Sequence, residues 1–236
     1  MKILTRNLLA ELLLESFEDR IAAMALHCLA SCCRTDQRTL WPVTIERLLI
    51  GVSAEDHEAV LASLQEHPFL AWSANARSAR VSPAPAFADD WQIIADKLTR
   101  FSAALREWSA DQNDTLRQHA LRKGALLFNH HLFFEVHEVL EAQWLQETGR
   151  EKLFFQGLIQ VAVAFYHLEN ANLRGAQMLL QDGMAKLFPY RPAFLGVELQ
   201  KFLTQLAVCR AELMQVGANA NPRFHKHQIP SVRFIE

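Results

Sequence analysis

The stretch LFFQGLIQVAVAFYHL, residues 153–168, is apolar nearly all the way round a helix, and it restricts the fold more than any other segment. A helix that lacks a polar face must be covered by other elements on every side. The rest of the chain can supply them, because apolar residues recur mostly at helical spacing and Gly and Pro number only 8 each. The sequence therefore predicts a mainly α protein with this helix at the buried centre of a bundle.

Residues 114–216 are predicted to form that domain, a five-helix bundle. The expected helices are Thr115–Asn129, Leu132–Glu147, Glu151–Glu169, Leu173–Leu187 and Leu195–Met214. Beyond them, residues 217–236 mix Pro, Asn, basic and apolar side chains without a period. That composition predicts an extended C-terminal arm.

Residues 1–86 are predicted to form a smaller domain of three helices and one short β-hairpin. The expected helices are Phe17–Cys33, Trp41–Val52 with Pro42 near its start, and Ser53–His67 with Ser53 as N-cap. The residues that follow alternate weakly around Asn75, as a hairpin does. Three helices followed by a hairpin is the order of a winged-helix module, so we expect a winged-helix-like domain.

Residues 87–113 are predicted to form a connecting helix that Asp89 and Asp90 cap. Its apolar side chains follow the heptad steps of 3 and 4, at Trp91, Ile94, Leu98, Phe101, Leu105 and Trp108. The seam is too short for a free-standing coiled coil. The helix could dock on the second domain or on a partner subunit, but plain core packing of these side chains is the favoured interpretation. A homo-oligomer would form through Met1–Phe17 or through the Trp91–Trp108 helix.

The charge pattern argues against DNA as the partner of the first domain. The chain carries 24 basic and 26 acidic side chains, so it has no overall attraction to nucleic acid or to an anionic membrane. The segment in the place of a recognition helix, 53–67, has four acidic side chains and no Lys or Arg. The expected wing offers Arg77 and Arg80, and two arginines can make only a few contacts with phosphate. A protein-interaction module is favoured, and DNA binding stays open.

The cysteines and the apolar segments indicate a cytoplasmic protein without a membrane span. The leucine-rich start is interrupted by Glu11, and it is typical of an amphipathic helix and not of a signal peptide. No stretch approaches the length of a transmembrane helix. Cys28, Cys32 and Cys33 cluster, but a second pair of zinc ligands is missing, so reduced core cysteines are expected.

The stretch FNHHLFFEVHEVLEAQW, residues 128–144, gathers histidines and glutamates among apolar side chains. In a helix that begins near Leu132, His137 and Glu141 lie one turn apart, and Phe134 and Trp144 continue that face. Glu135 and Glu138 fall on the adjoining face. The central helix offers a second polar stripe, because Gln156, Gln160 and His167 follow at steps of 4 and 7.

Two polar stripes on neighbouring helices predict a buried site between them, for a divalent metal or a small polar ligand. The candidate ligand-binding residues are Glu135, His137, Glu138, Glu141, Trp144, Gln156, Gln160 and His167. His137, Glu141 and His167 are the candidate metal ligands, and their convergence on one point would decide the question. The alternative is a hydrogen-bonded network, in which Glu141 pairs with His137 and the glutamines satisfy the remaining groups.

These motifs resemble the family called domain of unknown function 309, over about residues 115–190. Its pattern runs F-N, E-x-H-E-x-L-E-x-x-W, Q-G-L-I-Q-x-A and N-x-x-G-A. The matching positions are Asn129, Glu135, His137, Glu138, Glu141, Trp144, Gln156, Gly157, Gln160, Asn172, Gly175 and Ala176. The family often has Gly just after the Asn turn, where this chain has His131. The resemblance implies a small helical bundle and no particular reaction.

Simple physical roles are expected for three of these positions. Gly157 would let a neighbouring helix approach closely, and Gly175 would do the same at the start of the next helix. Asn172 is the expected N-cap there.

The sequence favours a binding or regulatory module over two alternatives. A metal-dependent hydrolase would use His137, Glu138 and Glu141, but HEVLE lacks the second His of the H-E-x-x-H motif. A ligand-sensing transcription regulator would place the sensor in the bundle and DNA binding in the first domain.

Overall fold

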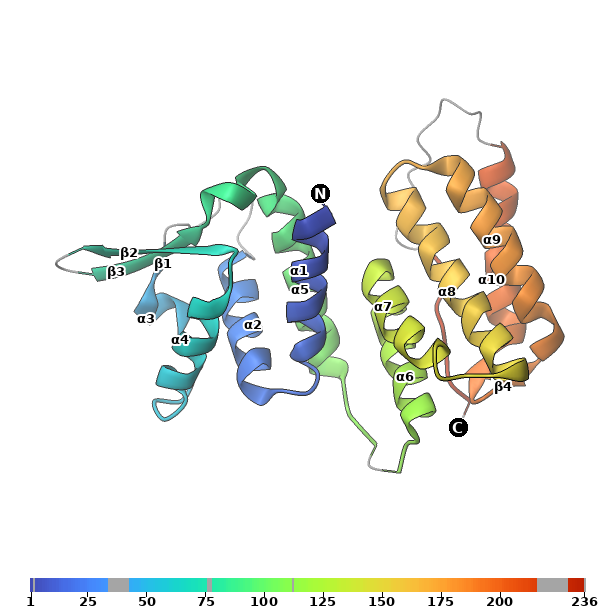
Figure 1. Ribbon diagram of the computed structural model, residues 1–236, viewed down its shortest axis with the longest axis horizontal. Coiled ribbons are helices and arrows are strands. Elements are labelled where there is room, and N and C mark those ends of the chain that lie inside the picture. Colours follow the sequence, from blue (N-terminus) through green and yellow to red (C-terminus); the bar gives the residue numbers. More distant parts are fainter. Residues whose placement is uncertain (2, 34–42, 76–77, 112, 216–228, 236) are drawn as a thin grey trace. The chain divides into compact units, whose positions relative to one another are not determined.

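The computed structural model describes residues 1, 3–33, 43–75, 78–111, 113–215 and 229–235. It is mainly helical with two small β-sheets (Figure 1). The chain divides into two compact units, Met1–Trp108 and Ser109–Glu236. Within the described residues, no helix combines the length and the apolar character needed to cross a membrane.

The first unit contains a three-stranded antiparallel sheet in the order β1-β3-β2. Its helices are α1 (Ile3–Glu15), α2 (Arg20–Cys33), α3 (Ile45–Leu48), α4 (His57–Glu66) and α5 (Trp91–Glu107), with a 3-10 helix η1 (Pro85–Asp90). Its strands are β1 (Val43–Thr44), β2 (Leu70–Asn75) and β3 (Ser78–Pro83). The predicted hairpin is confirmed as β2 and β3. Arg77 and Pro42 lie outside the described residues.

Of the predicted helix Trp41–Val52, only Ile45–Leu48 is helical among the described residues. Val43 and Thr44 form strand β1 beside β3, and the Thr44 hydroxyl accepts a hydrogen bond from the Arg47 backbone N–H. That cap starts the short helix α3. Pairing with a strand that lies far along the chain therefore overrides the local helical pattern.

Ser53 is not the N-cap of α4, which begins only after Asp56. The Ser53 hydroxyl donates to the Asp56 carboxylate at 2.7 Å, and Arg20 of α2 donates to both oxygens of that carboxylate, at 2.6 and 3.0 Å. Arg20 and Ser53 hold the pKa of Asp56 below its ordinary value. The bidentate pair with α2 thus occupies the carboxylate and keeps residues 53–56 outside the helix.

The heptad side chains of α5 belong to the core of the first unit, where α5 packs against α2. The buried residues of the seam are Trp91, Ile94, Leu98 and Phe101. Residues 85–90 form η1, so α5 begins at Trp91, and the Asp90 side chain makes no capping hydrogen bond to the helix. The segment 87–113, expected to be a connecting helix, is therefore mostly part of the first unit.

The second unit is built on five helices within the described residues. They are α6 (Leu116–Asn129), α7 (Phe133–Trp144), α8 (Gly149–Glu169), α9 (Leu173–Leu187) and α10 (Leu199–Gln215), with a 3-10 helix η2 (Phe188–Tyr190) and the hairpin β4 (Ala193–Phe194) and β5 (Val197–Glu198). The predicted start of the last helix at Leu195 is wrong. Leu195 and Gly196 have φ of 49° and 82° and turn the hairpin, so α10 starts after it.

Phenylalanine rings join the helices of the second unit into one core. The Phe128 ring of α6 lies 5.1 Å from Phe133 of α7, 5.5 Å from Phe165 of α8 and 5.7 Å from Phe202 of α10, between ring centroids. All four rings meet edge to face or stacked, as aromatic pairs prefer. This rigid core fixes α7 and α8, which carry the predicted polar stripes.

Candidate functional site

The candidate site lies on α7, which starts after a tight turn. α6 ends at Asn129, and His130 and His131 form the turn, as predicted. His131 adopts a φ of 58°, the left-handed conformation that glycine tolerates best. The position where the family often has Gly is therefore one that favours Gly on physical grounds.

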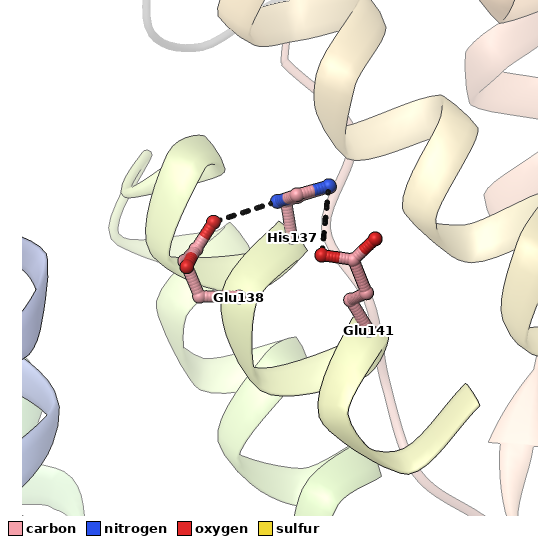
Figure 2. Close-up of side chains that lie close together, drawn as sticks. All are labelled: His137, Glu138 and Glu141. Carbon is pink, nitrogen blue, oxygen red and sulfur yellow. Dashed lines mark hydrogen bonds and ion pairs between the residues drawn. The ribbon is translucent and has the colours of Figure 1, made fainter. Parts of the chain in front are cut away.

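His137, Glu138 and Glu141 form a cluster on α7 (Figure 2), with one ligand atom from each residue within 4.8 Å of the others. His137 Nδ1 lies 2.9 Å from a Glu138 carboxylate oxygen, in a hydrogen bond. Its Nε2 lies 3.6 Å from a Glu141 carboxylate oxygen. The imidazole is thus held between two carboxylates from its own helix.

The two distances assign different roles to the two glutamates. The Glu138 carboxylate accepts a hydrogen bond from His137 Nδ1–H, so in the neutral imidazole the lone pair lies on Nε2, toward Glu141. At 3.6 Å the second contact is too long for a hydrogen bond. Two ligands held 2.0–2.2 Å from one tetrahedral ion lie about 3.3–3.6 Å apart. The arrangement therefore matches a metal-binding histidine with a carboxylate behind it and a second ligand beside it.

The cluster is half-exposed, which corrects the prediction of a buried site. The side chains of His137, Glu138 and Glu141 are 26%, 39% and 46% exposed. Glu135 is fully buried, and it is not a member of the cluster. The polar stripe of α8 is also only partly covered, because Gln156, Gln160 and His167 are each half-buried. α8 is consequently apolar on its core side and accessible along this stripe.

Helix α8 runs antiparallel to α7 and brings Gln160 level with the middle of α7. Lys152 lies over the Trp144 ring at 4.6 Å, and at the other end the Phe134 and Tyr166 rings are 5.5 Å apart. The Gln160 side-chain oxygen is buried without a hydrogen-bond partner in the described part of the chain, and so is the Trp144 indole nitrogen. A buried acceptor and a buried donor near the cluster favour a bound water or ligand.

His167 lies outside the cluster, because its side chain contacts the turn between α8 and α9. Its Nδ1 lies 3.1 Å from the side-chain nitrogen of Asn172, whose side-chain oxygen accepts from the Gly175 backbone N–H at 3.0 Å. Asn172 is thus the N-cap of α9, as predicted. A Cβ on Gly175 would meet the Asn172 side chain at 2.7 Å, so this glycine makes room for the cap and not for another helix.

One contact at the site follows from the spacing of three residues that places Phe134 on the face of His137, and a second contact was not predicted from the sequence. The Phe134 ring stacks on the His137 imidazole, with centroids 6.0 Å apart, and helps to orient it. The amide of Asn129 forms hydrogen bonds with the backbone of Val232, in the segment expected to be an extended arm. Asn129 belongs to the F-N part of the family pattern, but nothing in the local sequence indicated that it would contact Val232.

The segment that carries the cluster has known relatives. Residues 121–179 match the family described as "Domain of unknown function (DUF309)". The match holds the whole His137 cluster together with Gln156, Gln160 and His167.

One curated relative is "Uncharacterized protein YpuF" of Bacillus subtilis (strain 168), which is 38% identical over 53 residues. The alignment covers 22% of this chain and 30% of that protein, so the chain spans under a third of the relative's length. Neither description names a reaction.

Proposed function

We propose that the second unit is a binding module that holds a divalent ion of the zinc type on α7. His137 Nε2 and the Glu141 carboxylate are the two protein ligands, and Glu138 orients the imidazole through Nδ1. The supporting observation is the pair of distances at His137, with a hydrogen bond of 2.9 Å on one ring nitrogen and a 3.6 Å separation on the other. Imidazole and carboxylate are ordinary zinc ligands.

Two protein ligands leave two positions of a tetrahedral ion open. Structural zinc sites use four protein ligands, so this arrangement suits reversible binding of a water or a small polar ligand. Gln160 and Trp144 offer an acceptor and a donor on the neighbouring surface. A hydrolase would need a further protein ligand or a free base, and in the cluster that the described residues form, Glu138 is already engaged by His137. Binding is therefore the function that we favour.

Calorimetric titration of the untagged full chain with Zn²⁺ tests this proposal. One site is expected, lost in His137→Ala and in Glu141→Ala. Glu138→Gln keeps the ligands and weakens the orienting bond, so it should lower affinity about 10- to 100-fold. His130→Ala and Glu169→Ala remove the same residue types outside the cluster and should bind like the wild type. A folded wild type that binds no Zn²⁺ at millimolar concentration would refute the site.

For the first unit we propose a winged-helix-like module that binds protein. The order α2-β1-α3-α4-β2-β3 with the sheet order β1-β3-β2 supports this topology. On α4 and the turn before it, Glu55, Glu58 and Glu66 are exposed, and carboxylates repel phosphate. DNA affinity measured against salt separates the alternatives. A log-log slope near zero removes the DNA-binding regulator, whereas a steep negative slope removes our proposal.

A further inference from the structure

We infer that the second unit carries a binding groove for an extended peptide, and that residues 229–235 of the chain occupy it in cis. The Asn129 side chain donates to the Val232 carbonyl at 3.0 Å and accepts from the Val232 N–H at 2.9 Å. This pair of bonds contacts backbone alone, so it fixes a chain of any sequence in one orientation. The inference is independent of the proposed metal site.

The same segment is paired as a strand with the edge of the β4–β5 hairpin. The Ile235 N–H donates to the Gly196 carbonyl at 2.8 Å, and the Glu198 N–H donates to the Arg233 carbonyl at 2.9 Å. Val197 and Phe234 form an antiparallel bridge between these bonds. Adding an extended segment to a sheet edge is a recurrent mode of peptide recognition.

Two side-chain subsites give the groove its selectivity. Val232, 8% exposed, lies at an apolar pocket among α6, α7, α8 and α10 that Leu121, Phe128 and Phe202 help to line, and the cavity there measures about 20 Å³. Phe234 lies against Gly196, where a Cβ would come within 3.2 Å of the ring, and the Arg122 guanidinium lies 5.3 Å from the ring centroid. The groove therefore selects an aliphatic residue followed two positions later by an aromatic one.

The groove and the segment that occupies it come from different parts of the sequence. Asn129 and most of the residues lining the pocket belong to residues 121–179, which match the DUF309 family, whereas 229–235 lie outside that match. The segment is only partly covered, since Pro230 and Val232 are buried whereas Arg233 and Ile235 are exposed. The helices also have phenylalanine contacts of their own, from Phe128 to Phe165 and to Phe202. The expected partner is thus a protein with an exposed aliphatic-x-aromatic segment, which competes with 229–235.

Fluorescence anisotropy with a labelled peptide of sequence IPSVRFIE tests the groove. In the full chain, Val232→Ala with Phe234→Ala weakens the cis segment, and this double variant should bind the peptide. The wild type should bind at least 10-fold more weakly, because a tethered competitor acts at millimolar effective concentration. Adding Asn129→Ala to the double variant should lower affinity at least 10-fold, whereas adding Asn170→Ala should not. A peptide with Asp in place of Val should not bind.

Two results would overturn the inference. One is a folded double variant without saturable binding at 1 mM peptide, and the other is an affinity that does not change on Asn129→Ala. If the double variant fails to fold, a protease site placed within residues 216–228 of the otherwise unchanged chain provides a second measurement. After cleavage, the labelled peptide should exchange into the groove while the helical circular dichroism is retained. Absence of exchange, or unfolding on loss of the fragment, would show that the segment is an ordinary part of the core.

Discussion

Gly157 of α8 and Gly183 of α9 face one another, and they let the two helices touch backbone to backbone. A Cβ placed on Gly183 would lie 2.9 Å from the Gly157 carbonyl oxygen, and one on Gly157 would lie 3.2 Å from the Gly183 carbonyl oxygen. The close approach predicted for Gly157 is thus confirmed, and Gly183 is the partner that the sequence did not indicate.

Gly183→Ala should therefore destabilise the second unit, although alanine is the better helix former. The new methyl group meets backbone and Val161, which cannot move away easily, and overpacking of this kind costs about 1–3 kcal/mol. Urea denaturation followed by circular dichroism measures the loss. Asp182→Ala changes an exposed neighbour on the same helix and should stay within about 0.5 kcal/mol of the wild type. A more stable Gly183→Ala variant would contradict the close contact.

Arg117→Met should lower stability at neutral pH and reduce the loss of stability in acid. Glu147, 4% exposed, accepts from the Arg117 guanidinium at 2.7 and 2.8 Å and from Gln143 at 2.7 Å. These hydrogen bonds hold the pKa of Glu147 below its ordinary value, and those from Arg117 have the largest effect. Leaving the buried carboxylate without Arg117 should cost about 1–3 kcal/mol.

The direction of the pH effect follows from that lowered pKa. The stabilisation is complete above the pKa of Glu147 in the unfolded chain, about 4.3, and is lost as the pH falls through the lower folded value. Urea midpoints between pH 7 and pH 3 should thus fall more steeply for the wild type than for Arg117→Met. Parallel pH profiles would contradict the role of this pair. Arg174→Met, an exposed arginine of α9, is the control and should follow the wild type.

His131→Gly should be more stable than His131→Ala by about 1 kcal/mol. Both changes remove the imidazole that stacks on Phe133, but only glycine adopts the φ of 58° without a Cβ penalty. Thermal unfolding of the two variants measures the difference directly. Equal stabilities would argue against a left-handed residue in this turn.

Three of the four thiols should be protected from thiol reagents in the native protein. Burial raises the pKa of Cys28 and of Cys209 to about 11, and it also raises the pKa of Cys32. At pH 8, a pKa of about 11 leaves roughly one molecule in a thousand as thiolate. Cys33 is half-exposed, so we expect one fast-reacting group that Cys33→Ser removes. Guanidinium should make all four thiols react. Fast reaction of several thiols in the native protein would contradict this assignment.

The sequence predicted the helices of the second unit well, because their apolar spacing is local and repeats over many turns. It failed where a distant residue determines the local structure. Residues 43–44 form a strand because β3 pairs with them, and Asp56 in place of Ser53 stands at the N-cap position of α4, with its carboxylate bound by Arg20. Neither partner can be inferred from residues nearby in the sequence.

The candidate site was predicted in part, for the same reason. His137 and Glu141 were paired correctly, since a spacing of four residues fixes the geometry on any helix. Glu138 was assigned to another face, but the imidazole has a second nitrogen that reaches it. His167 was expected among the metal ligands, yet the Asn172 cap engages it through the turn.

The bonds between Asn129 and Val232 join residues that are 103 positions apart in the sequence. Helices form within about a microsecond, whereas closing so long a loop costs entropy that only a largely folded unit can offset. We therefore expect α6 to α10 to assemble first and the 229–235 segment to be seated last. During folding, each molecule would expose an open groove before its own segment fills it. A peptide present at that stage would bind without competition from residues 229–235.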